Sequence, residues 1–127
     1  PVDAWNIHNY VLEADRDQLD VAEFQRRIIA FRDWMARAGE GGKPLFLTEF
    51  GALFGLGHGG RPPEDPAAVL AYIDDPVGWL RATDYVQAWS WFADYTEGQF
   101  NGDLFDASGQ LSVYGQAYRR ANGLASP

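Results

Sequence analysis

The residue best placed to do chemistry is Glu49, which follows the apolar run of residues 44–48 in the segment KPLFLTEFG, residues 43–51. A carboxylate at the end of a buried strand costs free energy unless it is paired, hydrogen-bonded or used. In a βα architecture, active sites are built at the carboxyl ends of the strands. The segment alone therefore leaves two interpretations open: a functional carboxylate, or a Glu that merely leaves the sheet for solvent.

A second group of polar side chains ends the first predicted strand, residues 2–10. Because side chains alternate along a strand, Asn6 and His8 share one face, and Tyr10 follows with the same parity. An imidazole and a phenol are groups that can hold or orient a carboxylate. If this strand lies beside that of Glu49, we expect His8 and Tyr10 to approach it, with Asn6 available to contact a substrate.

A third predicted strand, residues 85–92, is rich in aromatic side chains. Trp89 and Trp91 share one of its faces, and small residues alternate with them. The two indole rings have two interpretations: a stacking platform beside Glu49, or plain core and interface residues. We expect one of them, Trp89 slightly before Trp91, to face a ligand.

Helical segments separate these strands. Asp20 and Glu23 form a capping box, and an apolar stripe at helical spacing predicts a helix that ends at Gly39. The breaks at prolines predict two short helices, at about residues 66–73 and 76–80. A last helix is predicted over about residues 112–121.

The order β-α-β-α-β-α predicts an α/β fold with parallel strands, in one domain of residues 1–127. Three parallel strands are too few to close a barrel. Alternation predicts that Leu45, Leu47, Trp89 and Trp91 line the face that the helices leave open. Parallel sheets are normally covered on both faces, so we expect self-association, as a dimer, or completion by a missing part of a barrel.

Composition narrows the class of partner. The chain has 127 residues, 46% of them hydrophobic, and a formal net charge of −8. That charge disfavours nucleic acid and anionic membranes, and it is compatible with a neutral ligand such as a sugar. There is no cysteine and no apolar run long enough for a transmembrane helix. The N-terminus does not read as a signal peptide.

Cofactor and metal sites are poorly supported. The glycine-rich residues 51–60 lack the GxxxxGK[ST] pattern of a phosphate-binding loop, and an active-site loop is the better interpretation. His8, His58 and Glu49 do not have the spacing of a metal motif, and His58 is expected in a solvent-exposed loop. The acidic residues between 94 and 106 do not follow an EF-hand pattern. We therefore predict neither cofactor nor metal.

Four segments in order carry a family resemblance: IHNY at 7–10, LTEFG at 47–51, AWSWF at 88–92, and the run from Leu104 to Tyr118. Together they resemble the C-terminal part, about strands six to eight, of a clan A retaining glycoside hydrolase barrel of the cellulase and β-glucanase type. The resemblance implies a partial (β/α)8 barrel that acts on β-linked glycans. It also favours an extracellular or periplasmic location.

The resemblance assigns roles to the strand-end residues. Glu49 matches the nucleophile, and Tyr10 matches the residue that hydrogen-bonds it and keeps it ionised. His8 matches a residue that orients the substrate or the acid/base, and Trp89 or Trp91 matches the sugar platform.

One part of the family's machinery is missing from this pattern. A retaining glycosidase needs two carboxyl groups about 5–5.5 Å apart, and the strand-four segment that carries the acid/base in such barrels is not found. The strand-two Arg that supports the nucleophile is not found either. Glu13, Asp94, Glu97 or a residue of a partner chain could substitute. Three functions stay open: a glycosidase, a non-catalytic carbohydrate-binding or assembly module, and a hydrolase of another type, such as an esterase or a metal-assisted enzyme.

Overall fold

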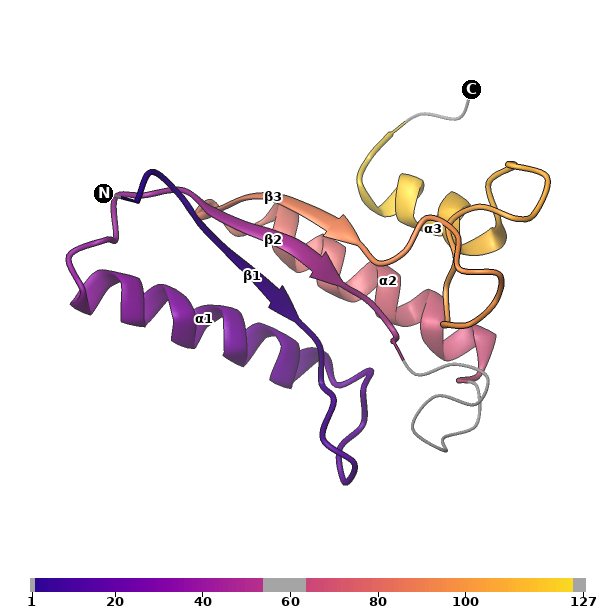
Figure 1. The fold of residues 1–127 in the computed structure, drawn as a ribbon, viewed down its shortest axis with the longest axis horizontal. Coiled ribbons are helices and arrows are strands. Elements are labelled where there is room, and N and C mark those ends of the chain that lie inside the picture. The colour runs from indigo at the N-terminus through magenta and orange to yellow at the C-terminus, as the bar shows by residue number, and fades with distance from the viewer. Residues whose placement is uncertain (1, 54–63, 125–127) are drawn as a thin grey trace.

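The computed structural model describes residues 2–53 and 64–124. Its six elements alternate as predicted (Figure 1). They are β1 (Trp5–Asn9), α1 (Val21–Arg37), β2 (Leu45–Phe50), α2 (Pro66–Arg81), β3 (Val86–Trp91) and α3 (Val113–Ala121).

The three strands form one parallel sheet in the order β1-β2-β3. Their arrows point the same way in Figure 1, and α1 returns along the sheet from the end of β1 to the start of β2. Buried side chains from all three helices join β2 and β3 in a single core cluster on one side of the sheet. The predicted fold, three parallel βα units in an open sheet, is confirmed.

Helix α1 follows the sequence prediction closely. The Asp20 side chain caps it by accepting from the backbone N–H of Glu23 at 3.0 Å. Phe24, Ile28 and Met35 are fully buried along its apolar stripe. The helix ends one residue before Ala38, and Gly39 follows with a φ of +78°. In the described residues, no helix is long and apolar enough to cross a membrane.

The prediction of two short helices between residues 66 and 80 is wrong, because α2 is continuous through Pro76. An internal proline loses a backbone hydrogen bond and crowds the preceding turn, at a cost of about 3 kcal/mol. That cost is offset by one uninterrupted buried face, to which Tyr72, Ile73, Val77 and Leu80 contribute.

The predicted assignment of sheet faces is also wrong. Leu45 and Leu47 are fully buried in the core under the helices, and their partners on β3 are Val86 and Trp89. Alternation correctly puts Leu45 with Leu47 and Trp89 with Trp91, but it does not say which side faces the helices, and register shifts bring Phe50 and Val86 to that side as well. The side that α1 and α2 cover is decided by the packing of their apolar stripes.

A bulge in β2 explains why Glu49 does not follow Leu47 into the core. Ile7 pairs with Leu47, but the next residue of β1, His8, pairs with Glu49, so β2 carries one extra residue at Thr48. The same extra residue appears in the pairing of β2 with β3. A bulge shifts the phase of alternation by one residue and re-aims the side chains that follow it. Glu49 therefore lies on the open face.

That open face is mostly polar, with the half-buried Phe46 between its pairing partners Asn6 and Ala88. Its exposed members include Asn6, His8, Thr48, Ala88 and Ser90. The prediction of an apolar surface made of leucines and tryptophans is wrong. An apolar open face therefore no longer supports self-association.

Candidate active site

Glu49 is held by two side chains from the end of β1. The Tyr10 hydroxyl donates to Glu49 Oε2 at 3.0 Å, and His8 Nδ1 lies 3.2 Å from the same oxygen. Among the described residues, no hydrogen bond reaches Oε1. The Glu49 side chain is 35% exposed and His8 is 54% exposed. One carboxylate oxygen is thus anchored by side chains from the end of β1, and the Glu49 side chain as a whole remains partly exposed.

The Tyr10 hydroxyl can donate its hydrogen bond to Glu49 at any physiological pH. Burial, and then the hydrogen bond to Glu49, raise the pKa of its phenol well above the ordinary value of 10.0. The hydroxyl therefore stays protonated across the physiological range. A neutral O–H donor stabilises a carboxylate without neutralising it.

A hollow of about 440 Å³ opens beside Glu49. Its lining comes from the ends of two strands and from the turn after β3: Thr48, Glu49, Ser90, Trp91, Phe92, Ala93 and Asp94. Strand ends of neighbouring parallel strands meet at one edge of the sheet, which is why residues so distant in sequence share this space.

Phe92 is the aromatic residue of this hollow that sequence reasoning missed. Its half-buried ring packs edge-on against Tyr10, with ring centroids 6.4 Å apart, and against Phe100 at 5.5 Å. The only sequence signal was its position as the last residue of the predicted third strand. The two neighbouring tryptophans masked that signal, because they are larger aromatics at strand positions.

The expected orientation of the Trp89 and Trp91 side chains toward the open face is wrong, although Trp91 is one of the residues that line the hollow with Glu49. The Trp91 side chain is 4% exposed, donates from Nε1 to the Gly102 carbonyl at 2.8 Å, and packs on Phe50. Trp89 packs against the core and donates from Nε1 to Asn122 Oδ1 at 2.9 Å. Both indoles point to the helix side because their β2 partners are the buried Phe50 and Leu47.

The other predicted site residues lie at different places. Asn6 is exposed on the same face as His8, two residues further from the strand end. Glu13 binds Arg27 at 2.6 Å, and that hydrogen bond lowers the pKa of its carboxyl. Asp94 lines the hollow, whereas Glu97 is exposed in the loop beyond it with a φ of +58°. Of these three carboxylates, Asp94 alone shares a cavity with Glu49.

Metal binding finds no support in the described part of the chain, which contains no cluster of three potential ligands. His58, and with it most of the glycine-rich segment, lies outside the described residues. The site therefore consists of a carboxylate contacted by Tyr10 and His8, beside a hollow whose lining includes Phe92.

Several solved structures of GH128 proteins are similar to this chain, and no curated protein matches. A GH128 (subgroup I) endo-β-1,3-glucanase from Amycolatopsis mediterranei, in complex with laminaritriose, shares 20% identity at a TM-score of 0.67. A GH128 (subgroup VII) oligosaccharide-binding protein from Trichoderma gamsii shares 24% identity at a TM-score of 0.59. A GH128 (subgroup V) exo-β-1,3-glucanase from Cryptococcus neoformans shares 25% at 0.50.

These matches cover most of this chain and less than half of each solved protein. The shares of this chain are 95%, 94% and 76%, and those of the matched chains are 46%, 39% and 39%. The three βα units described above thus correspond to part of a larger barrel.

The four sequence segments resemble a glycoside hydrolase barrel, and a family model agrees at that level. A family model described as "Glycosyl hydrolase catalytic core" matches residues 1–118, nearly the whole sequence. The chain belongs to the glycosyl hydrolase catalytic core family.

Proposed function

We propose that this chain carries the nucleophile side of a retaining glycoside hydrolase site for β-1,3-linked glucans, with Glu49 as the nucleophile. The observation that carries the proposal is the arrangement on Glu49: the Tyr10 hydroxyl donates to Oε2, His8 Nδ1 lies 3.2 Å from the same oxygen, and the hollow lies beside the carboxylate. The linkage is suggested by the matched GH128 proteins, which include endo- and exo-β-1,3-glucanases.

In this proposal Oε1 of Glu49 attacks the anomeric carbon and forms a glycosyl ester, while the glycosidic C–O bond breaks. The departing oxygen takes a proton from a general acid, and water later hydrolyses the ester. Tyr10 and His8 hold the carboxylate in line for attack, and Phe92 forms the wall against which a sugar ring rests. The general acid comes from the rest of a barrel or from a partner chain, with Asp94 the nearest local substitute.

A fluorinated sugar tests this assignment without requiring the general acid. We expect a 2-fluoro laminari-oligosyl fluoride to label Glu49, since fluoride departs with the bonding electrons and needs no proton donor. Intact-mass and peptide-mapping spectrometry would detect the adduct. The matched variant Glu49→Gln should take no label while still binding laminari-oligosaccharides. Unlabelled wild-type protein that binds the sugar would overturn the nucleophile assignment.

A second candidate is an oligosaccharide-binding module without turnover. It is favoured by the similarity to the oligosaccharide-binding protein from Trichoderma gamsii. The same experiment separates the two functions, because a binding module retains sugar affinity in both the wild-type protein and Glu49→Gln and forms no adduct in either.

A further inference from the structure

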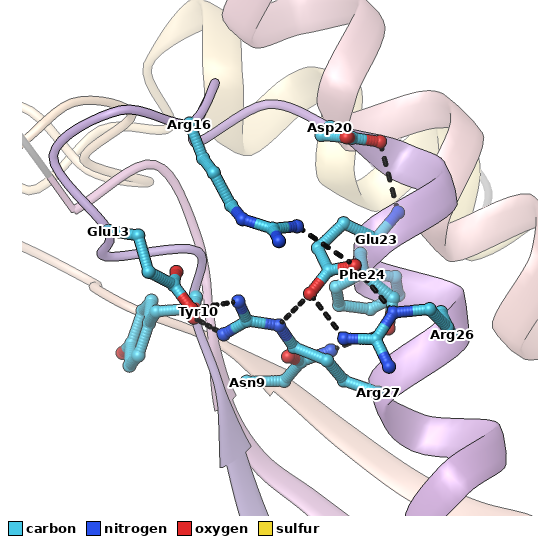
Figure 2. A network of polar contacts seen from close by, with 9 residues as sticks. All are labelled: Asn9, Tyr10, Glu13, Arg16, Asp20, Glu23, Phe24, Arg26 and Arg27. Carbon is cyan, nitrogen blue, oxygen red and sulfur yellow. Dashed lines mark hydrogen bonds and ion pairs between the residues drawn. The ribbon is translucent and has the colours of Figure 1, made fainter.

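A cluster of charged side chains lies at the N-terminal end of α1 (Figure 2), and none of its members lines the hollow. At its centre is Glu23, whose side chain is only 6% exposed. Arg26 contacts its two oxygens at 2.6 and 2.7 Å, Arg27 at 2.7 Å, and Arg16 at 3.4 Å. The hydrogen bonds from Arg26 and Arg27 lower the pKa of Glu23 to about 2. Glu23 is therefore a fixed negative charge around which the arginines are arranged.

Arg27 also reaches the residue that follows β1. Its Nε donates to Glu23 and its Nη2 donates to Glu13 at 2.6 Å. Its Nη1 donates to the backbone carbonyl of Tyr10 at 2.7 Å. A planar guanidinium bound at three nitrogens has little freedom to turn, so the carbonyl of Tyr10 is held in one place.

A second tie fixes the residue before Tyr10. The side chain of Asn9 is buried, at 3% exposure, and its Nδ2 donates to the carbonyl of Phe24 at 2.8 Å. Both Asn9 and Tyr10 are thus fastened to the first two turns of α1. In Figure 2 the Tyr10 ring is directed away from Arg27, while its carbonyl faces the guanidinium. The Tyr10 ring packs against Phe92, and its hydroxyl donates to Glu49 Oε2.

We propose that Arg27 is a positioning residue for Glu49: by holding the Tyr10 carbonyl, it fixes the direction in which the Tyr10 hydroxyl meets the carboxylate. The inference deepens the proposed function, because it assigns to α1 the support of the group that orients the nucleophile. The geometric link itself, from Arg27 through Tyr10 to Glu49, can be measured without any sugar chemistry.

The test compares Arg27→Lys with the matched control Arg26→Lys. Lysine keeps the charge beside Glu23, but its single ammonium cannot serve three separated acceptors as the guanidinium does. Arg26 also bonds Glu23, but its side chain is 64% exposed, and within residues 2–53 and 64–124 it makes no hydrogen bond to β1 or to Tyr10. Both variants should fold, which circular dichroism would check, and Arg27→Met provides a stronger disruption.

The readout is NMR of ring-labelled tyrosine at neutral pH, with Tyr10→Phe identifying the Tyr10 signal. In Arg27→Lys we expect the ring-to-ring cross-peaks between Tyr10 and Phe92 to weaken, and the Tyr10 Cζ signal to move toward that of a solvent-exposed tyrosine. The wild-type pattern should persist in Arg26→Lys. An unchanged Tyr10 signal in Arg27→Lys and Arg27→Met overturns the proposal, and so does an equal change in Arg26→Lys.

A titration of the Tyr10 phenol distinguishes two effects of Arg27, because they shift the pKa of Tyr10 in opposite directions. Removing a positive charge near a phenol by itself raises its pKa, whereas loss of the hydrogen bond to Glu49 lowers it. We expect the pKa of Tyr10 to fall in Arg27→Met. A rise would mean that Arg27 acts on Tyr10 through its charge alone and would overturn the positioning role.

The rate of labelling by the fluorinated sugar distinguishes this proposal from the proposed function. A misplaced nucleophile should be labelled more slowly in Arg27→Lys, on the order of 10-fold, with Arg26→Lys unaffected. If the wild-type protein takes no label while the Tyr10 signals respond to Arg27→Lys, the proposed function fails and the positioning role stands. If labelling occurs and the Tyr10 signals do not respond, the positioning role fails alone.

Discussion

At the scale of single residues, the feature that matters most is that Tyr10 and His8 both approach the same oxygen of Glu49. In the proposed mechanism, contacts at Oε2 leave Oε1 as the atom that attacks the sugar, and they restrict the orientation of the carboxylate beside the hollow. The raised pKa of the Tyr10 phenol keeps this donor protonated, so the anchor does not switch off near neutral pH. Held in this way, a side chain that is about one third exposed can still have one orientation.

Phe92 gives a prediction at this scale. Phe92 lines the hollow, and an aromatic side chain there should contribute apolar contact to a bound sugar. We expect Phe92→Ala to weaken binding of laminari-oligosaccharides by roughly 10-fold, equivalent to about 1.4 kcal/mol, as measured by calorimetry. The control is Trp89→Phe, which loses the bond to Asn122 and should lower stability while leaving affinity unchanged. The reverse pattern would restore Trp89 as the sugar platform.

At the scale of elements, the N-terminal end of α1 predicts an acid-sensitive stability. Glu23 has a pKa of about 2 in the folded chain against an ordinary value of 4.5, so the unfolded chain takes up the proton first as pH falls. Its stabilising contribution is fully present above about pH 4.5 and is lost as the pH falls toward 2.

Glu23→Gln should therefore reduce the free energy of unfolding most near neutral pH, with the difference from wild type shrinking below pH 4.5. Urea unfolding at several pH values would measure it. Asp74→Asn, a change at an exposed carboxylate of α2, is the control. Parallel stability curves for the wild-type protein and Glu23→Gln over pH 2–7 would contradict this linkage.

The junction between β2 and β3 gives a second prediction at the element scale. A Cβ added at Gly51 would lie 2.5 Å from the carbonyl oxygen of Phe92, whose own N–H donates to the Phe50 carbonyl at 2.8 Å. The two strand ends can approach only because residue 51 lacks a side chain. We expect Gly51→Ala to cost about 1–3 kcal/mol and to displace Phe92.

Gly42→Ala is the matched control for this substitution. No atom lies within 4 Å of a Cβ added there, so its thermal unfolding should match that of the wild-type protein. A Gly51→Ala variant as stable as Gly42→Ala would mean that the strand ends can separate at little cost.

At the scale of the whole molecule, the sheet has a polar open face and two outer strands, β1 and β3, each with one neighbour among the described residues. Unpaired strand edges are templates for pairing with further strands. Self-association therefore remains our prediction, now on the basis of these edges instead of an apolar face. Light scattering combined with size-exclusion chromatography should detect a dimer at micromolar concentration. A monomer under those conditions would sink the prediction.

The similarity to longer barrel proteins suggests another way to complete the sheet. This chain spans 39–46% of the matched GH128 structures, in which further βα units complete the barrel. Addition of sequences that supply such units is the alternative to pairing between copies, and a second carboxylate could reach Glu49 by either route.

Much of this architecture was determined by local sequence alone. The capping of α1 by Asp20, the buried stripe of Phe24 and Met35, and the alternation of strands with helices follow from periodicity and end signals that act within a few residues. The proximity of His8 and Tyr10 to Glu49 also followed, because parallel strands bring their carboxyl ends to one edge.

Only the tertiary structure decided which face each side chain occupies. Alternation correctly put Trp89 and Trp91 together, but the apolar stripes of α1 and α2 chose the face that holds them. One extra residue at Thr48 shifted the alternation of side chains within β2 and put Glu49 on the face opposite to Leu47. No residue type near Thr48 predicted this bulge. The sequence by itself determined the elements and the candidate nucleophile; packing and a single bulge decided its surroundings, because both depend on contacts between residues far apart in the chain.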